Sequence, residues 1–79
     1  MIEPSEIESL IKKDLPDATV AVRDLTGTKD HYEAVIVSDA FVGKSRIDRH
    51  RIVYAALGDA MKQRIHALTM KTLTRGETP

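Results

Sequence analysis

Apolar residues recur at helical spacing near the start of the chain. Four of them lie three or four residues apart: Ile7, Leu10, Ile11 and Leu15. This spacing makes one apolar stripe on a helix. Pro4 suits the first helical turn, where its missing N–H costs nothing, and Ser5 with Glu8 offers an alternative capping box one residue later. Because Pro16 cannot continue a helix, the pattern predicts a helix over residues 4–15.

Two strand-like segments follow this helix. Residues 19–24 predict a first strand, with Val20 and Val22 on one side. Residues 25–30 form a turn centred on Gly27, too long for a two-residue hairpin. Residues 32–38 make the second strand, and its run 34–37 is apolar at every position, which indicates a central strand covered on both faces.

A second helix is predicted after a connector that spans residues 38–45, with one short helical turn around residues 39–42. Ser45 can cap this helix, and Asp48 is favourable in its first turn. The expected core stripe is Ile47, Tyr54, Leu57 and Met61, flanked by Ile52, Val53, Ala56 and Ala60. Gly58 weakens a helix interior by about 1 kcal/mol, but the pattern extends the helix to about Gln63.

Residues 65–72 predict a third strand, with His66, Leu68 and Met70 on one face. The order helix, strand, strand, helix, strand predicts an α/β (α+β) domain, with a three-stranded mixed sheet and helices packed on one face. The link from the second to the third strand is long enough for a right-handed parallel crossover. Residues 1–79 make a single domain, residues 74–79 are polar, and residues 73–79 are expected to be flexible. The core should contain Leu10, Val22, Ile36, Phe41, Val53, Leu57 and Leu68.

Composition narrows the possible functions. The 79 residues contain no cysteine, which excludes disulfides, zinc–thiolate sites and a thiol nucleophile. The formal net charge is zero, so the whole chain is not a nucleic-acid-binding polycation. No apolar run approaches the ~20 residues of a membrane span, and charged residues interrupt any signal-peptide core, so a cytoplasmic protein with no membrane contact is expected. A net charge of zero can still hide a basic face. Basic residues crowd one segment of this chain: Lys44, Arg46, Arg49, His50 and Arg51.

The ordered set of motifs resembles the BolA-like family. The segments that carry the resemblance cover nearly the whole chain: Asp24-Leu25-Thr26-Gly27, His31-Tyr32, Val37-Ser38-Asp39-Ala40-Phe41, Gly43-Lys44-Ser45, Arg49-His50-Arg51, Val53-Tyr54-Ala55-Ala56-Leu57 and Ile65-His66-Ala67-Leu68-Thr69-Met70-Lys71-Thr72. The resemblance implies a class II KH-like α-β-β-α-β fold. It also implies a non-enzymatic partner of monothiol glutaredoxins that shares a [2Fe-2S] cluster in iron–sulfur trafficking or iron homeostasis. A second role that the resemblance implies is DNA binding and transcriptional regulation linked to stress and cell shape.

The resemblance also indicates which residues bind the cluster. The glutaredoxin brings a cysteine and a glutathione thiolate, and the BolA-like partner brings histidine. His66 matches the family's histidine at the start of the last strand, and a neutral imidazole can replace a thiolate on one iron. The family's second ligand lies in the loop between the first two strands, but residues 25–30 contain neither cysteine nor histidine. His31, at the end of that loop, is the nearby candidate. The isolated protein is expected to be a cluster-free monomer that forms a heterodimer with the glutaredoxin.

Each candidate also has a structural interpretation. His66 could be a half-buried strand residue that hydrogen-bonds the backbone, His31 a solvated turn residue, and His50 a packing or capping residue. The group Lys44, Arg46, Arg49 and Arg51 is either a solvated helix face or a surface that contacts glutaredoxin, glutathione or nucleic acid. KH domains clamp nucleic acid with a Gly-x-x-Gly loop, whereas residues 43–46 read Gly-Lys-Ser-Arg and lack the second glycine. No serine–histidine–acid set is evident at local spacing, which disfavours catalysis.

Overall fold

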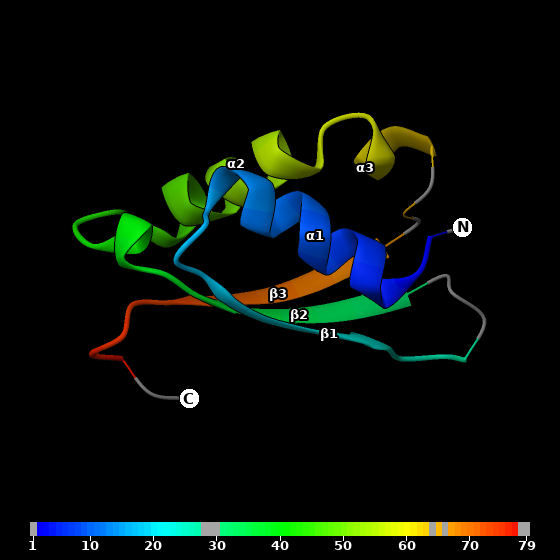
Figure 1. Ribbon diagram of the computed structural model, residues 1–79, viewed down its shortest axis with the longest axis horizontal. Helices are drawn as coiled ribbons and strands as arrows, with labels where there is room; N and C mark the ends of the chain where they lie inside the picture. Colours follow the sequence, from blue (N-terminus) through cyan, green and yellow to red (C-terminus); the bar gives the residue numbers. More distant parts are fainter. Residues whose placement is uncertain (1, 28–30, 64, 66, 78–79) are drawn as a thin grey trace.

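The computed structural model describes residues 2–27, 31–63, 65 and 67–77. Its elements follow one another in the order α1 (Pro4–Asp14), β1 (Thr19–Asp24), β2 (His31–Val37), the 3₁₀ helix η1 (Asp39–Phe41), α2 (Arg46–Leu57), α3 (Ala60–Gln63) and β3 (Ala67–Leu73). The helices cover one face of the three-stranded sheet (Figure 1). The predicted α+β class and the α-β-β-α-β order are therefore confirmed. Within the described part of the chain, no helix is long and apolar enough to cross a bilayer.

The sheet has the strand order β1-β2-β3. β1 pairs antiparallel with β2, from Thr19 opposite Val37 to Asp24 opposite Tyr32. β2 pairs parallel with β3, from His31 opposite Ala67 to Val37 opposite Leu73. β2 is central, as predicted, but it is not covered on both faces. Alternate residues of β2 are buried under the helices, while those between them stay partly or fully exposed, because no element of the described chain packs on the second face (Figure 1).

α1 begins as the proline predicts. Pro4 occupies the first helical turn, and Glu3 is the N-cap residue with no side-chain capping bond. The alternative capping box of Ser5 and Glu8 does not form, because Ser5 already lies inside the helix, where its carbonyl accepts a hydrogen bond from Ser9 Oγ at 3.0 Å. The chain turns at Leu15, whose N–H donates to Ile11 O at 2.9 Å.

The core lies between the helices and the sheet. Four of the predicted core residues are buried: Ile36, Phe41, Val53 and Leu57. The other three are partly buried and pack against this cluster: Leu10, Val22 and Leu68. Ile65 is also buried at 4% exposure, although β3 begins only at Ala67 and not at residue 65 as predicted.

The predicted apolar stripe of the second helix is wrong at Ile47 and Tyr54 and is confirmed at Leu57, which is buried, and Met61, which packs against the core. Ile47 is 64% exposed and Tyr54 is 42% exposed, whereas Val53 and Leu57 are buried. α2 ends at Leu57, where Gly58 adopts a φ of 54° and turns the chain before α3 begins. The predicted stripe continued to residue 61 and therefore combined two helices. Within α2, at about 100° per residue, Ile47 lies about 120° around the helix from the buried Val53 and so faces another direction.

The start of α2 agrees with the prediction. Ser45 is the N-cap residue, and its Oγ accepts a hydrogen bond from Asp48 N at 3.2 Å. The predicted short helical turn is η1, whose N-cap Ser38 accepts from Ala40 N at 3.1 Å. A Ser cap satisfies one of the amide groups that a helix start leaves without a partner. These caps fix where the basic segment begins.

Candidate functional site

His31 lies at the end of the sheet where β2 and β3 begin. It is the first residue of β2, not a turn residue, and its side chain is exposed. Its Cα partner across the ladder is Ala67, the first residue of β3. The other predicted ligand, His66, directly precedes Ala67 in the sequence and lies outside the described residues. In the part of the chain that the structure describes, no three His, Cys, Asp or Glu residues gather in a way that could hold a metal ion.

The turn before β2 is held by backbone and carboxylate contacts. Asp24 Oδ1 accepts from Thr26 N at 3.2 Å and from Gly27 N at 3.0 Å, and Gly27 has a φ of 76°. Leu25 N donates to His31 O at 2.8 Å. Residues 28–30 of this predicted turn lie outside the described residues. The backbone of His31 is thus fixed to the residue that follows β1, while its side chain is exposed.

Tyr32, the neighbour of His31, points into the core. Its hydroxyl donates to Ile2 O at 2.7 Å and accepts from Ile2 N at 3.4 Å. Tyr32 is 1% exposed, so these bonds lie away from water. They anchor the residues before α1 to the same end of the sheet that carries His31.

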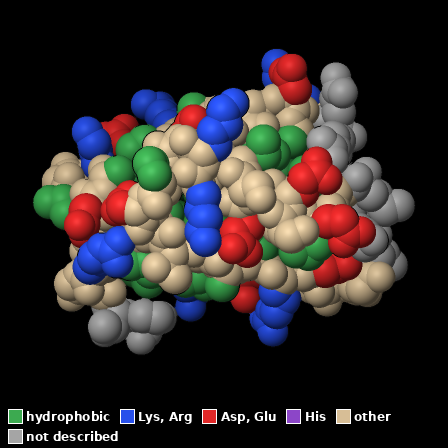
Figure 2. Space-filling view, in the orientation of Figure 1, with side chains coloured by type: hydrophobic (Ala, Val, Ile, Leu, Met, Phe, Trp, Pro, Cys, Tyr) green, Lys and Arg blue, Asp and Glu red, His purple; other side chains and the backbone are tan. Residues whose placement is uncertain are grey.

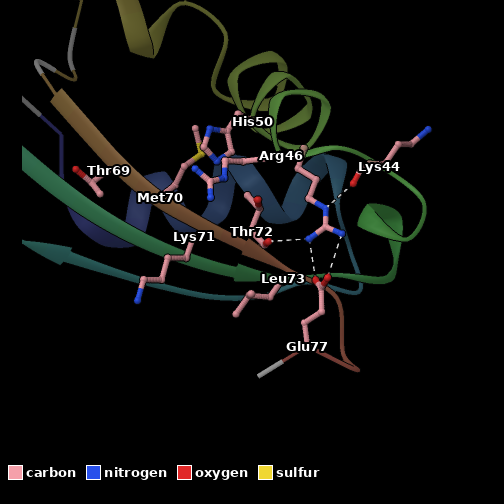
Figure 3. A pocket seen from close by; sticks show the side chains of 10 residues that line it. Lys44, Arg46, His50, Thr69, Met70, Lys71, Thr72, Leu73 and Glu77 are labelled. Atoms are coloured by element: carbon pink, nitrogen blue, oxygen red, sulfur yellow. Dashed lines mark hydrogen bonds and ion pairs between the residues drawn. The ribbon is translucent and has the colours of Figure 1, made fainter. Parts of the chain in front are cut away.

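The opposite end of the sheet carries a basic pocket. It encloses about 600 Å³ between the start of α2 and the end of β3 (Figure 3). Its lining side chains are Lys44, Arg46, Arg49, His50, Thr69, Met70, Lys71, Thr72, Leu73 and Glu77. The predicted basic group therefore does gather at one place, although Arg51 is not part of the lining. His50 is partly buried at the pocket, in agreement with a packing residue.

Arg49 is the most connected of the basic residues. Its Nε donates to Lys44 O at 3.0 Å, and its Nη1 donates to Thr72 O at 3.0 Å and to Glu77 Oε1 at 2.7 Å. The guanidinium also lies 6.0 Å from the centroid of the Phe41 ring. Only 14% of the Arg49 side chain is exposed. Its contacts satisfy most of what a guanidinium can donate.

Glu77 is a site residue that the sequence did not reveal. Residues 74–79 were expected to be frayed, yet Thr74 N donates to Glu77 Oε1 at 2.8 Å, and the same carboxylate pairs with Arg49. The hydrogen bond from Arg49, followed by that from the Thr74 backbone, lowers the pKa of Glu77 to about 2. The two partners are 28 residues apart, and no local pattern signals such a contact.

The remaining basic residues differ from Arg49. Arg51 is 77% exposed and lies 3.8 Å from Asp48, a loose pair one helical turn away. Lys44 and Arg46 are exposed and line the pocket. The predicted binding group thus divides into one largely buried cation and three exposed ones. Exposed pairs such as that of Arg51 contribute little to stability.

A second contact holds the segment after β3. Arg75 Nη2 donates to Asp17 O at 2.6 Å, and its guanidinium lies 3.5 Å from Asp39. The Asp17 carboxylate accepts from Ser38 Oγ at 2.8 Å and from Asp39 N at 2.9 Å. The backbone N–H of Asp39, and next the Ser38 hydroxyl, lower the pKa of Asp17. The described residues after β3 therefore contact Arg49 of α2 through Glu77, and they contact Asp17 and Asp39 through Arg75.

Known proteins resemble this chain in both sequence and fold. The family described as "BolA-like protein" matches residues 7–77. The uncharacterized protein RP812 of Rickettsia prowazekii is 36% identical over 92% of this chain and 95% of its own length. The Escherichia coli DNA-binding transcriptional regulator BolA is 38% identical over 61% of this chain, a segment that spans only 46% of that protein. The structure of a BolA protein homologue from Coxiella burnetii covers 96% of this chain and 95% of its own, with a TM-score of 0.83 and 35% identity.

Proposed function

Because this chain belongs to the BolA-like protein family, we propose that it is a non-enzymatic, cytoplasmic partner of a monothiol glutaredoxin. The two proteins share a [2Fe-2S] cluster in iron–sulfur trafficking or iron homeostasis. The glutaredoxin supplies a cysteine and a glutathione thiolate, and this chain supplies imidazole. The observation that carries the proposal is the ladder pairing of His31 with Ala67, the residue that follows His66 in the sequence.

Chain geometry supports a shared role for the two histidines. A trans peptide holds adjacent Cα atoms about 3.8 Å apart, so His66 cannot lie far from Ala67 in any conformation. Paired strands lie about 4.8 Å apart, and His31 is the partner of Ala67 in the β2–β3 ladder. The His31 backbone therefore lies opposite the residue that is covalently bonded to His66. His31 also has the exposure that a ligand to a shared cluster needs.

The ligand chemistry follows from the residues that the chain offers. With no cysteine in the sequence, histidine is the side chain at hand that suits iron, and histidine ligands occur on one iron of Rieske-type [2Fe-2S] centres. Coordination needs an unprotonated ring nitrogen, so acid should weaken the cluster as imidazole protonates. The cluster belongs to the complex, because the glutaredoxin supplies the thiolates.

DNA binding is the second candidate function. The Escherichia coli relative is a DNA-binding transcriptional regulator, and Lys44, Arg46 and Arg51 are exposed. Two observations weaken this candidate. Arg49 is held by Glu77 within its own chain, and residues 43–46 lack the second glycine of a KH loop.

Two titrations separate these candidates. In the first, the chain is added to a monothiol glutaredoxin that carries its cluster, and visible absorption and circular dichroism are recorded. In the second, the chain is added to duplex DNA across a salt series. The favoured function predicts a heterodimer with an altered cluster spectrum and weak DNA binding. Tight DNA binding that falls steeply with salt, as counterion release requires, without any glutaredoxin complex would reverse the order of the two candidates.

A further inference from the structure

Glu77 occupies the basic pocket in the way that a bound carboxylate would. Its Oε1 lies 2.7 Å from Arg49 Nη1 and its Oε2 lies 3.4 Å from Nη2, so two parallel donors face one carboxylate. Paired contacts of this kind are the geometry with which arginine recognises carboxylates. Glu77 reaches Arg49 from the segment that follows β3, and Figure 3 shows its carboxylate directed into the pocket.

Arg49 is positioned for this contact independently of Glu77. The carbonyl of Lys44 accepts from its Nε and the carbonyl of Thr72 accepts from its Nη1, both at 3.0 Å. The Phe41 ring lies under the guanidinium. These contacts fix the orientation of the planar group, so it needs little ordering when an acceptor arrives. A cation held in place with one replaceable acceptor is a binding site for an anion.

The charges around the pocket favour a negatively charged occupant. Four of the ten lining residues are basic, namely Lys44, Arg46, Arg49 and Lys71, whereas Glu77 is the one acidic residue of that lining. If the Glu77 carboxylate leaves, the described lining keeps four cations and no anion. The molecule as a whole is neutral, and Lys and Arg side chains are interspersed with Asp and Glu on the face that Figure 2 shows. Without Glu77, the charge of the pocket lining is therefore positive, whereas the surrounding surface carries both signs.

The wall of the pocket formed by β3 is the open edge of a sheet. β3 is an outer strand of the sheet, and it supplies residues 69–73 of the lining. Leu73 O accepts from Ser38 N at 2.9 Å on the β2 side, whereas Thr72 O accepts from Arg49 on the opposite side. Successive backbone groups of a strand point in opposite directions, so Met70 shares the outward direction of Thr72. Such an edge can pair with an added extended peptide.

We propose that the groove between the start of α2 and the edge of β3 binds an extended, acidic peptide segment of a partner protein, and that Glu77 occupies its carboxylate site in the free chain. In the bound state a glutamate or aspartate of the partner replaces Glu77 on Arg49. The partner backbone lies along Met70 and Thr72, and Lys44 and Arg46 face its further acidic side chains. Glu77 is an intramolecular competitor that sets the affinity threshold. This inference does not rest on the cluster chemistry.

The test compares the wild-type chain with Glu77→Gln, which removes the charge but keeps the shape. The probes are acetyl-Thr-Glu-Thr-Glu-Thr-amide, the same peptide with glutamine for glutamate, and glutarate as a free carboxylate. Binding is followed by the Arg49 side-chain N–H and the Thr72 amide in NMR spectra. In the wild type, only the fraction of molecules in which Glu77 has left Arg49 can bind the peptide, and the apparent affinity is reduced by that fraction. Glu77→Gln should therefore bind the acidic peptide about tenfold more tightly than wild type.

The matched control is Glu33→Gln, which removes the carboxylate of another arginine pair, at 3.0 Å from Arg23 on β1. It should bind the acidic peptide as the wild type does. Glutarate should bind Glu77→Gln at least tenfold more weakly than the peptide, because it cannot use the strand edge. Arg46→Gln, which leaves the Arg49 contacts intact, should weaken peptide binding about threefold through loss of one exposed charge.

Three outcomes would overturn the proposal. The first is equal affinity of wild type and Glu77→Gln for the acidic peptide, since Glu77 would then not compete. The second is equal binding of the glutamine peptide, or of glutarate, which would remove the need for a carboxylate or for a peptide. The third is a gain of affinity of Glu77→Gln for duplex DNA without a gain for the peptide, which would assign the pocket to phosphate.

Discussion

The two ends of the β2–β3 ladder differ in what their polar groups contact. Where the strands end, Arg49, Glu77 and Thr72 bind one another within the chain. Where the strands begin, His31 is exposed beside the residue that follows His66. The ends are six residue steps apart, about 20 Å at about 3.3 Å per residue, and lie at opposite sides of Figure 1. At one end the polar groups contact one another within the chain, and at the other the His31 side chain is exposed, so loss of a residue should have different consequences at each.

The largest expected effect is at the histidine end. His66→Ala should abolish the altered cluster spectrum of the glutaredoxin complex, because the proposed ligand to one iron is lost. Absorption and circular dichroism of the reconstituted complex measure this, and far-ultraviolet circular dichroism checks the fold. His31→Ala should have the same effect if His31 completes the ligand pair.

His50→Ala is the control for these two variants, since His50 lines the pocket at the other end. It should leave the cluster spectrum unchanged. An unaltered spectrum in His66→Ala would remove the ligand assignment, and His66 would then be a structural residue. An unaltered spectrum in His31→Ala alone would leave His66 with another partner.

The next largest effect is expected at the arginine end. Arg49→Ala should lower the free energy of unfolding by about 1.5–3 kcal/mol, because it removes charge-assisted hydrogen bonds from a largely buried side chain. Urea denaturation measures the change. The matched control is Arg51→Ala on the same helix, whose side chain is 77% exposed and whose loss should cost under about 0.5 kcal/mol. Equal losses in the two variants would mean that the contacts of Arg49 do not stabilise the fold.

A smaller effect is expected at the buried contact next to His31, where Tyr32 binds the backbone before α1. Tyr32→Phe removes the buried hydroxyl that binds the backbone of Ile2. It should lower the free energy of unfolding by about 1 kcal/mol, because the Ile2 carbonyl loses its donor. Tyr54→Phe, at a residue that is 42% exposed, should change it little. Hydrogen exchange of residues before α1 should accelerate only in Tyr32→Phe.

The smallest effect concerns acid. The pKa of Glu77 is about 2 in the folded chain, below its ordinary value of 4.5, so its contribution to stability is present above about pH 4.5 and is lost as the pH falls toward 2. Glu77→Gln should therefore be less stable than wild type at neutral pH, and the two should converge near pH 2. Urea midpoints measured from pH 7 to pH 2 give the difference.

Glu77→Gln should still lose some stability as the pH falls, because the pKa of Asp17 is also lowered in the fold. The control is the Arg49→Gln background, in which Glu77→Gln should have a smaller pH-dependent effect, because only hydrogen bonds from Thr74 then lower the pKa of Glu77. A constant difference between wild type and Glu77→Gln across the whole range would show that the ion pair with Arg49 does not hold the carboxylate in its charged form.

Local signals in the sequence predicted the first strand and two of the helix starts well. Residues 19–24 form β1 as expected, Ser45 caps α2, and Pro4 starts α1. These features depend on neighbouring residues, so a local pattern is enough. The class and element order followed from them, since each element could be recognised by its own period.

The errors arose where distant residues decide the outcome. Ile47 and Tyr54 fit an apolar helical period, but Gly58 ends the helix and the fold buries the face of α2 that carries Val53. The Arg49–Glu77 pair spans 28 residues, and a polar C-terminal segment looks like a frayed end when its partner is unknown. The basic group was found because its members are adjacent in sequence, but its division into a structural arginine and exposed cations needed the fold.

The parallel ladder also restricts how the length of this chain can vary. β2 and β3 each contribute seven residues, paired one to one from His31–Ala67 to Val37–Leu73. A deletion of one residue in β3 would reverse the side of the sheet that every following side chain faces. It would move either the residue next to His66 or the carbonyl that Arg49 binds out of place. Insertions and deletions are therefore tolerable in the turns of this protein but not in the strand that joins its two ends.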